Sequence, residues 1–433
     1  MVKLRILVVS YLPWRDDVSV GNTLSNLFDG LQEKIEIASI YFKGGMPQNN
    51  VTSLDYYIPE KELAKSIITR KKVGYQIDKT ENDEYSDENK KGIYNKAREM
   101  RWESMLLAQD LIGLLGVWKT ENLYKFVEAF NPDIIFGPLG RVPVANLLMK
   151  HIHDKYDIPI VAYAWDDHYS LHKKSFSVFF WIKTFLERKY IKECASECEF
   201  LYTITSLMKD EYEKYFNKKC RVLYKSYSFE GEPSFQEDIC YPIKIVYMGN
   251  IGSGRWQVLA KIAKAIERIN SEQVKAFLNI YTMSPTSEKM EKALNIPGAS
   301  ELMRPVSNEQ VLKIMKSANI LLHVEPISEK ERLFYRLSFS TKIVDYFYSA
   351  RCIMAVGGET AAMSYLRDND AAIVLKEDSN IYMELKELID NPERILEYGE
   401  KSWECGVKKH KRSVVQGKMF SDLINLKREK TLE

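Results

Sequence analysis

The sequence of 433 residues has few cysteines, little excess charge and no long apolar run, and each absence excludes a class of protein. Its six cysteines are scattered, and only Cys194 and Cys198 lie close together, at a helical spacing with no second pair or histidine nearby. This pattern argues against a zinc site and favours reduced cysteines in a cytoplasmic protein. The formal net charge of +2 gives no case for a nucleic-acid partner.

No stretch approaches the roughly 20 consecutive apolar residues that a membrane-spanning helix needs. The N-terminal run 2–10 is short and ends in Tyr-Leu-Pro-Trp rather than in a small-residue cleavage site, so we expect a buried strand and not a signal peptide. Hydrophobic residues make up 45% of the chain and charged residues 28%, which is the balance of a globular protein. The length allows two or three domains with full cores.

What the sequence does contain is a repeated alternation of strand-like apolar runs and amphipathic helices. The first block opens with the strand 4–10, and Gly21-Asn22-Thr23 is expected to open the helix that follows. This order is typical of a Rossmann-like fold, in which ligands collect at the carboxyl ends of parallel strands. Gly21 and Asn22 are therefore candidates for a ligand-contacting loop, and a glycine that merely lets the helix pack explains the pattern equally well.

Composition sets the expected domain boundaries. Between about 61 and 120 the chain becomes strongly charged, which we interpret as a mostly helical insertion in the first domain. The polar stretch 228–242 is the best linker. The predicted domains are therefore 1–230 and 231–412, and residues 413–433 are expected to form a helix that packs back on the first domain.

The second block contains the better-defined candidate site. A strand at 243–247 runs into a loop with Gly249, Asn250 and Gly252, and Arg255 stands at the entrance of the next helix. Glycines let the backbone approach a diphosphate closely, and an arginine offers it a planar fork of donors. The alternative is an ordinary surface arginine.

The stretch 338–359 is predicted to form a helix, a strand and a glycine loop. Its hydroxyl-rich start, with Ser340 and Thr341, offers unpaired backbone N–H groups to an anion, and Lys342 adds positive charge. Asp345, one turn further on, can accept hydrogen bonds from a sugar diol. This combination suits a nucleotide-diphosphate ligand.

A second candidate site lies in the first block. The strand 158–164 ends in Trp165-Asp166-Asp167-His168, and an acidic pair with a histidine at the carboxyl end of a strand indicates a site. The alternative is that Asp166 caps the following helix while His168 lies on the surface.

A helix expected at 173–190 is rich in aromatic and basic residues. A helix of this composition could rest on an anionic membrane surface. A helix buried between two lobes has the same composition, so both interpretations stay open.

The order of these motifs resembles the family 4 branch of the GT-B glycosyltransferases over most of the chain. The stretch 246–250 with Arg255 resembles that family's donor loop, 319–324 its pre-site strand, and 340–350 its nucleotide-sugar helix. The resemblance implies an α/β fold of two Rossmann-like domains that face each other across a cleft, with the C-terminal helix returning to the first. It also implies sugar transfer with retention of configuration.

Three departures from the family pattern affect the expected site. Leu337 stands eight residues before Asp345, where the family often has a first acidic residue. Asn250 and Trp165 stand where an arginine and a histidine are common. These departures leave Arg255 as the main cation with Lys342 in support, and Asp345 on the ribose.

The predicted function is therefore that of a glycosyltransferase. It would move a sugar from a UDP-, GDP- or other nucleotide-diphosphate sugar to a hydroxyl of a glycan, lipid-linked or other glycoconjugate acceptor, without a metal or another cofactor. The alternatives are a non-catalytic glycosyltransferase-like partner protein and a nucleotide-sugar epimerase. The expected location is the cytoplasm, with peripheral contact on the inner face of the membrane as an option. The residues assigned are Asp166, Asp167 and His168 for catalysis, Gly249, Asn250, Gly252, Arg255, Ser340, Thr341, Lys342 and Asp345 for the donor, and Gly21 and Asn22 for an acceptor or inter-domain loop.

Overall fold

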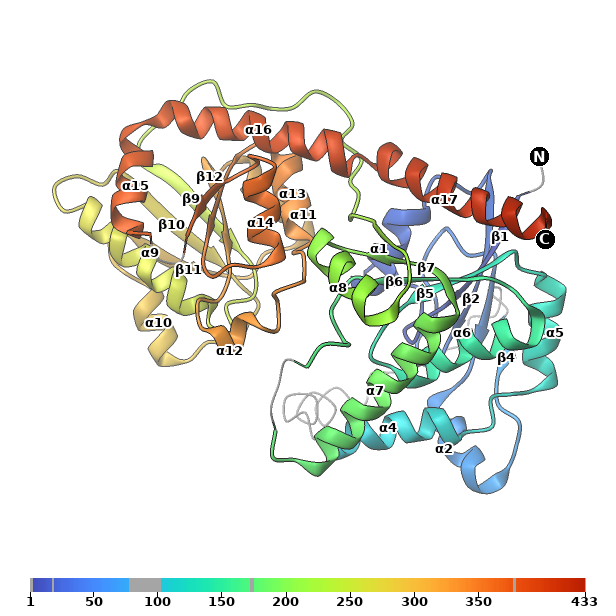
Figure 1. Ribbon diagram of the computed structural model, residues 1–433. Coiled ribbons are helices and arrows are strands. Elements are labelled where there is room, and N and C mark those ends of the chain that lie inside the picture. Colours follow the sequence, from blue (N-terminus) through green and yellow to red (C-terminus); the bar gives the residue numbers. More distant parts are fainter. Residues whose placement is uncertain (1–2, 18, 78–102, 172–174, 377–378, 433) are drawn as a thin grey trace. The chain divides into compact units, whose positions relative to one another are not determined.

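A computed structural model describes residues 3–17, 19–77, 103–171, 175–376 and 379–432 (Figure 1). The chain divides into two compact units, which are Met1–Leu223 with Gln416–Glu433, and Tyr224–Val415. Each unit is built on a mostly parallel β-sheet with helices packed against it, so the predicted α/β fold class is confirmed. The stretch 228–242, which was expected to be the linker, lies inside the second unit.

The first unit contains an eight-stranded sheet in the order β4-β3-β2-β1-β5-β6-β7-β8. Adjacent strands are parallel except for β3 and β4, and β1 and β6 are almost completely buried because their apolar residues face helices on both sides. The strands are β1 (Leu4–Val9), β2 (Ile35–Tyr41), β3 (Leu54–Tyr57), β4 (Tyr75–Gln76), β5 (Ile134–Pro138), β6 (Ile160–Ala164), β7 (Cys198–Thr203) and β8 (Cys220–Val222).

Helices α2, α4, α6 and α7 of the first unit pack side by side (Figure 1). The expected charged insertion contains α2, β4 and α4, and its residues 78–102 lie outside the described part of the chain. From Gln416 onward, α17 packs on this unit, where Asp422 accepts from Arg221 at 2.6 Å. The helices are α1 (Ser19–Phe28), α2 (Glu60–Thr69), α4 (Glu103–Leu115), α5 (Glu121–Phe130), α6 (Pro143–Tyr156), α7 (Val178–Glu197), α8 (Ser206–Phe216) and α17 (Arg412–Leu432).

The second unit contains a six-stranded, wholly parallel sheet in the order β11-β10-β9-β12-β13-β14. Its core lies between the sheet and the buried faces of α9 and α15, which pack side by side (Figure 1). The strands are β9 (Ile243–Met248), β10 (Ala276–Tyr281), β11 (Ser300–Met303), β12 (Ile320–Val324), β13 (Cys352–Val356) and β14 (Ile373–Leu375). The helices are α9 (Arg255–Ile269), α10 (Glu288–Leu294), α11 (Asn308–Lys316), α12 (Glu329–Arg332), α13 (Lys342–Ser349), α14 (Ala361–Asp368), α15 (Ile381–Asp390) and α16 (Pro392–His410).

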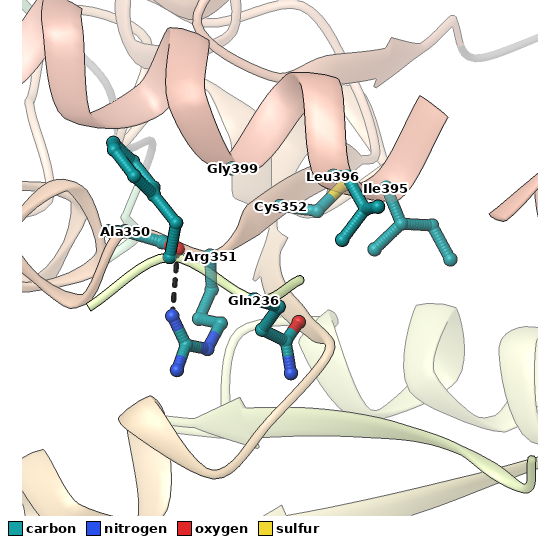
Figure 2. Close-up of a pocket in the computed structure, with 8 residues that line it drawn as sticks. Gln236, Ala350, Arg351, Cys352, Ile395, Leu396 and Gly399 are labelled. Atoms are coloured by element: carbon teal, nitrogen blue, oxygen red, sulfur yellow. Dashed lines mark hydrogen bonds between the residues drawn. The ribbon is translucent and has the colours of Figure 1, made fainter. Parts of the chain in front are cut away.

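Arg351 anchors the stretch that was expected to be a linker. Its buried guanidinium donates to the backbone carbonyls of Ser234 at 2.6 Å, Lys316 at 2.6 Å and Ala350 at 2.9 Å. Figure 2 shows this side chain in a small pocket that Gln236 and Gly399 also line. The pocket therefore belongs to the packing of the segment around Ser234 and shares no residue with the candidate site described below.

The cysteines and acidic residues form no metal centre in the part of the chain that the structure describes. Cys194 and Cys198 are both buried, and the Cys198 thiol donates to the Cys194 carbonyl at 3.2 Å. Among the described residues, every helix is too short or too polar to cross a bilayer.

Candidate donor-binding site

The candidate site of the second unit lies where the strand order of its sheet reverses. β9 is paired with β10 on one side and with β12 on the other, and β12 continues to β13. Loops that follow two such neighbouring strands diverge and leave a crevice at their carboxyl ends, which is where open α/β sheets bind ligands. The loop 249–254 follows β9, and Glu325 follows β12.

Asn250 shapes the glycine loop from within. Its Oδ1 atom accepts from the Gly252 backbone N–H at 2.6 Å and from the Ser284 hydroxyl at 3.1 Å, while the Tyr247 hydroxyl donates to its carbonyl at 2.7 Å. The Gly249 N–H donates to the Tyr281 carbonyl at 3.0 Å. The residue that stands in place of the family's arginine thus holds the turn that leads into α9.

Gly254 is the N-cap of α9 and has a backbone φ of 80°. A Cβ atom at this position would lie 2.2 Å from a carboxylate oxygen of Glu331, which belongs to α12. The left-handed conformation favours glycine, and an added Cβ atom would also displace the Glu331 carboxylate. The N-terminus of α9 therefore has a carboxylate beside it.

Arg255, the first residue of α9, is folded against β12. Its Nε donates to the Val324 carbonyl at 3.1 Å and its Nη2 to the Glu325 carboxylate at 3.2 Å. The guanidinium also lies 4.2 Å from the ring centroid of Tyr335, a cation–π contact. The side chain is only 14% exposed, so the expected main cation of the site is already partly paired.

Glu325 was not singled out from the sequence, although it directly follows the carboxyl end of a buried strand. It is buried, and its Oε1 atom lies 3.1 Å from Nε2 of the His323 imidazole, within hydrogen-bond distance. Gly357 lets the backbone after β13 approach that of Glu325 closely, because a Cβ there would lie 2.1 Å from the Glu325 carbonyl oxygen. The signal that points to Glu325 is its place at the strand end next to the donor loop.

Helix α13 brings Lys342 and Asp345 to the site. Lys342 is exposed and lies close enough to Asp345 for their charges to interact. The Asp345 carboxylate is 3.4 Å from the ammonium of Lys225, a residue that was also missed from the sequence. Burial raises the pKa of Asp345, and the charges of Lys225 and Lys342 oppose this rise.

The start of α13 is held by its own backbone. The Ser340 carbonyl accepts from the Ile343 N–H at 3.0 Å, and the Thr341 carbonyl accepts from the Val344 N–H at 3.3 Å. Leu337, at the place of the first acid, is buried. Its apolar side chain therefore belongs to the core of the unit.

The three catalytic candidates of the first unit differ in exposure. Asp167 is buried, and its Oδ1 accepts from the backbone N–H groups of Tyr169 and Ser170 and from the Tyr212 hydroxyl, at 3.0 to 3.1 Å. Asp166 is exposed and His168 is half-buried. Asp167 thus holds the loop after β6, and Asp166 presents its carboxylate at the surface.

The capping role considered for Asp166 belongs to another residue. The next described helix after this loop is α7, and the Ser177 hydroxyl caps it by accepting from the Phe180 N–H at 3.3 Å. Of the helix expected at 173–190, residues 173 and 174 lie outside the described part.

Gly21 and Asn22 lie inside α1 rather than before it, because the helix begins at Ser19. A Cβ on Gly21 would lie 2.0 Å from the Arg15 carbonyl oxygen, so this glycine lets the preceding loop pack on the helix. Asn22 is exposed, and its amide lies 3.5 Å from the Asp16 carbonyl.

Comparison with solved structures identifies the class of the fold. The chain is similar to HepE from Anabaena in complex with UDP-glucose, with a TM-score of 0.60, 9% identity and coverage of 98% of this chain and 100% of that one. It is similar to a glycosyltransferase from Rickettsia africae, with a TM-score of 0.57, 11% identity and 98% coverage of both chains.

A further neighbour is a putative UDP-N-acetylglucosamine 2-epimerase from Listeria monocytogenes, with a TM-score of 0.52, 10% identity and coverage of 100% of this chain and 98% of that one. No protein-family model and no curated protein sequence matches the chain. The structural likeness establishes that the chain has the GT-B fold of two Rossmann-like α/β units.

Proposed function

We propose that this protein is a glycosyltransferase that uses a nucleotide-diphosphate sugar as donor. The observation that carries the proposal is the meeting of a glycine loop, two cations and the half-buried carboxylate of Asp345 at the strand-order reversal of the second unit. Arg255 and Lys342 can balance the charge of a leaving diphosphate, and Asp345 can accept hydrogen bonds from ribose hydroxyls. HepE, whose structure contains UDP-glucose, supports the donor class.

The finer features of the proposal concern mechanism and acceptor. The transfer proceeds with retention of configuration and without a metal, and the acceptor is a hydroxyl of a glycan, a lipid-linked sugar or another glycoconjugate. In the first unit, Asp166 contacts the acceptor hydroxyl or stabilises the developing positive charge on the sugar. Its exposure favours it over Asp167 for this role.

We further propose that the protein works in the cytoplasm and docks on the inner face of the membrane through α7. Five large apolar side chains at the start of this helix are exposed, and the exposed Lys189 and Lys192 follow them along it. An apolar end that is flanked by basic residues suits an anionic bilayer surface. The exposed apolar residues are Val178, Phe179, Trp181, Ile182 and Phe185.

A panel of nucleotide diphosphates and their sugars, measured by thermal shift, tests the donor assignment. A ligand that binds only the folded protein raises the melting temperature by an amount that grows with its affinity. We expect one nucleotide diphosphate and its sugar to stabilise the protein. If none does at millimolar concentration, the proposal is wrong.

Incubation of the stabilising donor with and without acceptors separates the three activities that share this fold. Transfer to an added glycan or lipid-linked acceptor supports the transferase. An isomerised sugar formed from donor alone indicates the epimerase instead, the activity class named for the neighbour from Listeria monocytogenes. Tight binding without hydrolysis, transfer or isomerisation indicates a non-catalytic partner protein.

A further inference from the structure

We propose that Lys225 is the positioning residue of the donor site, whose ammonium group orients the Asp345 carboxylate and keeps it available as an acceptor for the ribose hydroxyls. This inference rests on the proposed nucleotide-sugar donor. Lys225 lies next to the first residue of the second unit, far in sequence from α13. No motif of the sequence includes it.

The geometry gives Lys225 two contacts on α13. Its Nζ atom lies 3.4 Å from the Asp345 carboxylate and 3.5 Å from the carbonyl oxygen of Thr341, the N-cap residue of the helix. One ammonium therefore joins the start of the helix to the side chain one turn later. The Lys225 side chain is 11% exposed and that of Asp345 is 29% exposed, so the lysine lies on the protein side of the carboxylate.

His410 fixes the backbone that carries Lys225. It is completely buried, with Nδ1 at 2.9 Å from the Lys225 carbonyl and Nε2 at 2.8 Å from the Tyr365 hydroxyl. Burial lowers the pKa of His410 to about 4, so the ring is neutral at physiological pH. Because a carbonyl can only accept, Nδ1 carries the proton and Nε2 accepts from Tyr365.

The backbone after Lys225 is hydrogen-bonded to the segment 410–412. The Tyr227 N–H donates to the His410 carbonyl at 2.9 Å, and the Arg412 N–H donates to the Tyr227 carbonyl at 2.7 Å. The lysine thus projects from a backbone that is hydrogen-bonded both at its own carbonyl and at Tyr227. A fixed backbone lets a long, flexible side chain keep one position at a smaller loss of entropy.

The charge of Lys225 also acts on the protonation of Asp345. Burial disfavours the ionised form of Asp345, and a protonated carboxyl group loses acceptor capacity for a diol. Lys342 is exposed and available to the ligand, so the less exposed Lys225 is the cation that can act on Asp345 whether or not a ligand is bound. The titratable groups close to the Asp345 carboxylate are Lys225, Tyr227, Lys342 and Tyr346. Arg255 on α9 lies close to Lys342.

The test is the nucleotide affinity of Lys225→Met and Lys225→Arg as a function of pH. UDP, GDP, ADP and CDP are titrated into the full-length protein by calorimetry, and the tightest ligand is followed from about pH 5.5 to about pH 8. Loss of the ammonium raises the pKa of Asp345 further, so a smaller fraction is ionised as the pH falls. We expect Lys225→Met to weaken binding several-fold more at the acidic end than at the basic end, and Lys225→Arg to restore most of the affinity.

Asp345→Asn provides the control, because an amide does not titrate. Adding Lys225→Met to this background should produce no pH-dependent loss. If Lys225→Met alone folds poorly, the Asp345→Asn background also removes the half-buried carboxylate that has lost its partner. A loss of affinity that is equal at every pH, or no loss, overturns the role of Lys225 and leaves the donor site intact. If wild-type protein binds none of the four nucleotides, the proposed function and this inference both fail.

Discussion

The guanidinium of Arg255 is bonded to the carboxylate of Glu325 at 3.2 Å, and both side chains are almost buried. The residue expected to be the main phosphate-binding cation therefore has a protein anion as its partner. A bound diphosphate would have to share the N–H donors of the Arg255 guanidinium with Glu325. The Val324 carbonyl and the Tyr335 ring hold the guanidinium in position when no ligand is bound.

This pairing predicts that the structural and binding roles of Arg255 can be separated. Arg255→Met leaves Glu325 buried without its partner, which should lower the free energy of unfolding by about 3 kcal/mol and weaken nucleotide-diphosphate binding at least about tenfold. Arg255→Met combined with Glu325→Gln should recover most of the stability but none of the binding. Urea unfolding and calorimetric titration measure the two effects, and recovered binding in the double variant would exclude Arg255 as a ligand contact.

Asp345→Ala should weaken the binding of a nucleoside diphosphate while leaving that of inorganic pyrophosphate undiminished. The carboxylate is assigned to the ribose, and pyrophosphate has none. The matched control is Asp368→Ala, which removes an exposed carboxylate from α14 in the same unit. Equal affinity of wild type and Asp345→Ala for every nucleotide would contradict the ribose role.

Gly254→Ala and Gly298→Ala should destabilise the second unit by similar amounts and differ in their effect on nucleotide binding. Both glycines have positive φ angles, 80° and 72°, so each alanine costs about 1 to 2 kcal/mol of backbone strain. At Gly298 nothing lies within 4 Å of the new Cβ, whereas at Gly254 it meets Glu331. Chemical unfolding gives the stabilities, and we expect nucleotide affinity to fall only for Gly254→Ala. Equal nucleotide affinity of the two variants would argue against a role of the α9 N-terminus in binding.

His410 should make stability depend on pH between about 6.5 and 4. Its folded-state pKa is lowered to about 4, below the usual value of 6.5 in the unfolded chain, so the unfolded state binds the proton first as the pH falls. Stability from this group is complete above pH 6.5 and decreases as the pH drops toward 4, by about 3 kcal/mol in total. Urea unfolding across this range should show a smaller slope for His410→Gln than for wild type.

The exposed apolar residues of α7 should direct the protein to anionic vesicles. We expect co-sedimentation with vesicles that contain phosphatidylglycerol, weaker binding to pure phosphatidylcholine, and a decrease when salt is raised. Trp181→Ser with Phe185→Ser should reduce binding at least about tenfold. Met383→Ser, at an exposed methionine of the second unit, is the control and should bind like wild type.

The sequence predicts the strands and the alternation of elements well, because a buried parallel strand is an unbroken apolar run, such as 160–164 or 352–356. It also places Arg255, Lys342 and Asp345 on the right elements. Helix starts are less certain, and α1 and α7 begin elsewhere than expected because Ser19 and Ser177 carry little signal by themselves.

The partners of the site residues could not be predicted in this way. Asp345 and Lys225 are 120 residues apart, and Arg255 and Glu325 are 70 apart. Such pairs depend on the strand order of the sheet and on the backbone held by His410, neither of which is visible in local periodicity. The glycine loop was interpreted as a phosphate cradle, whereas the bonds made by Asn250 could be known only from its folded conformation.

An isolated parallel β-bridge joins Tyr227 to Lys411 and holds the two ends of the second unit together. Tyr224 and Val415, the two ends of the second unit, each lie within a few residues of this bridge, so the unit is one contiguous stretch whose ends are tied together. Domains with adjacent ends tolerate insertion into a host and circular permutation. Residues 224–415 therefore have the topology of a domain inserted between Leu223 and Gln416 of the first unit.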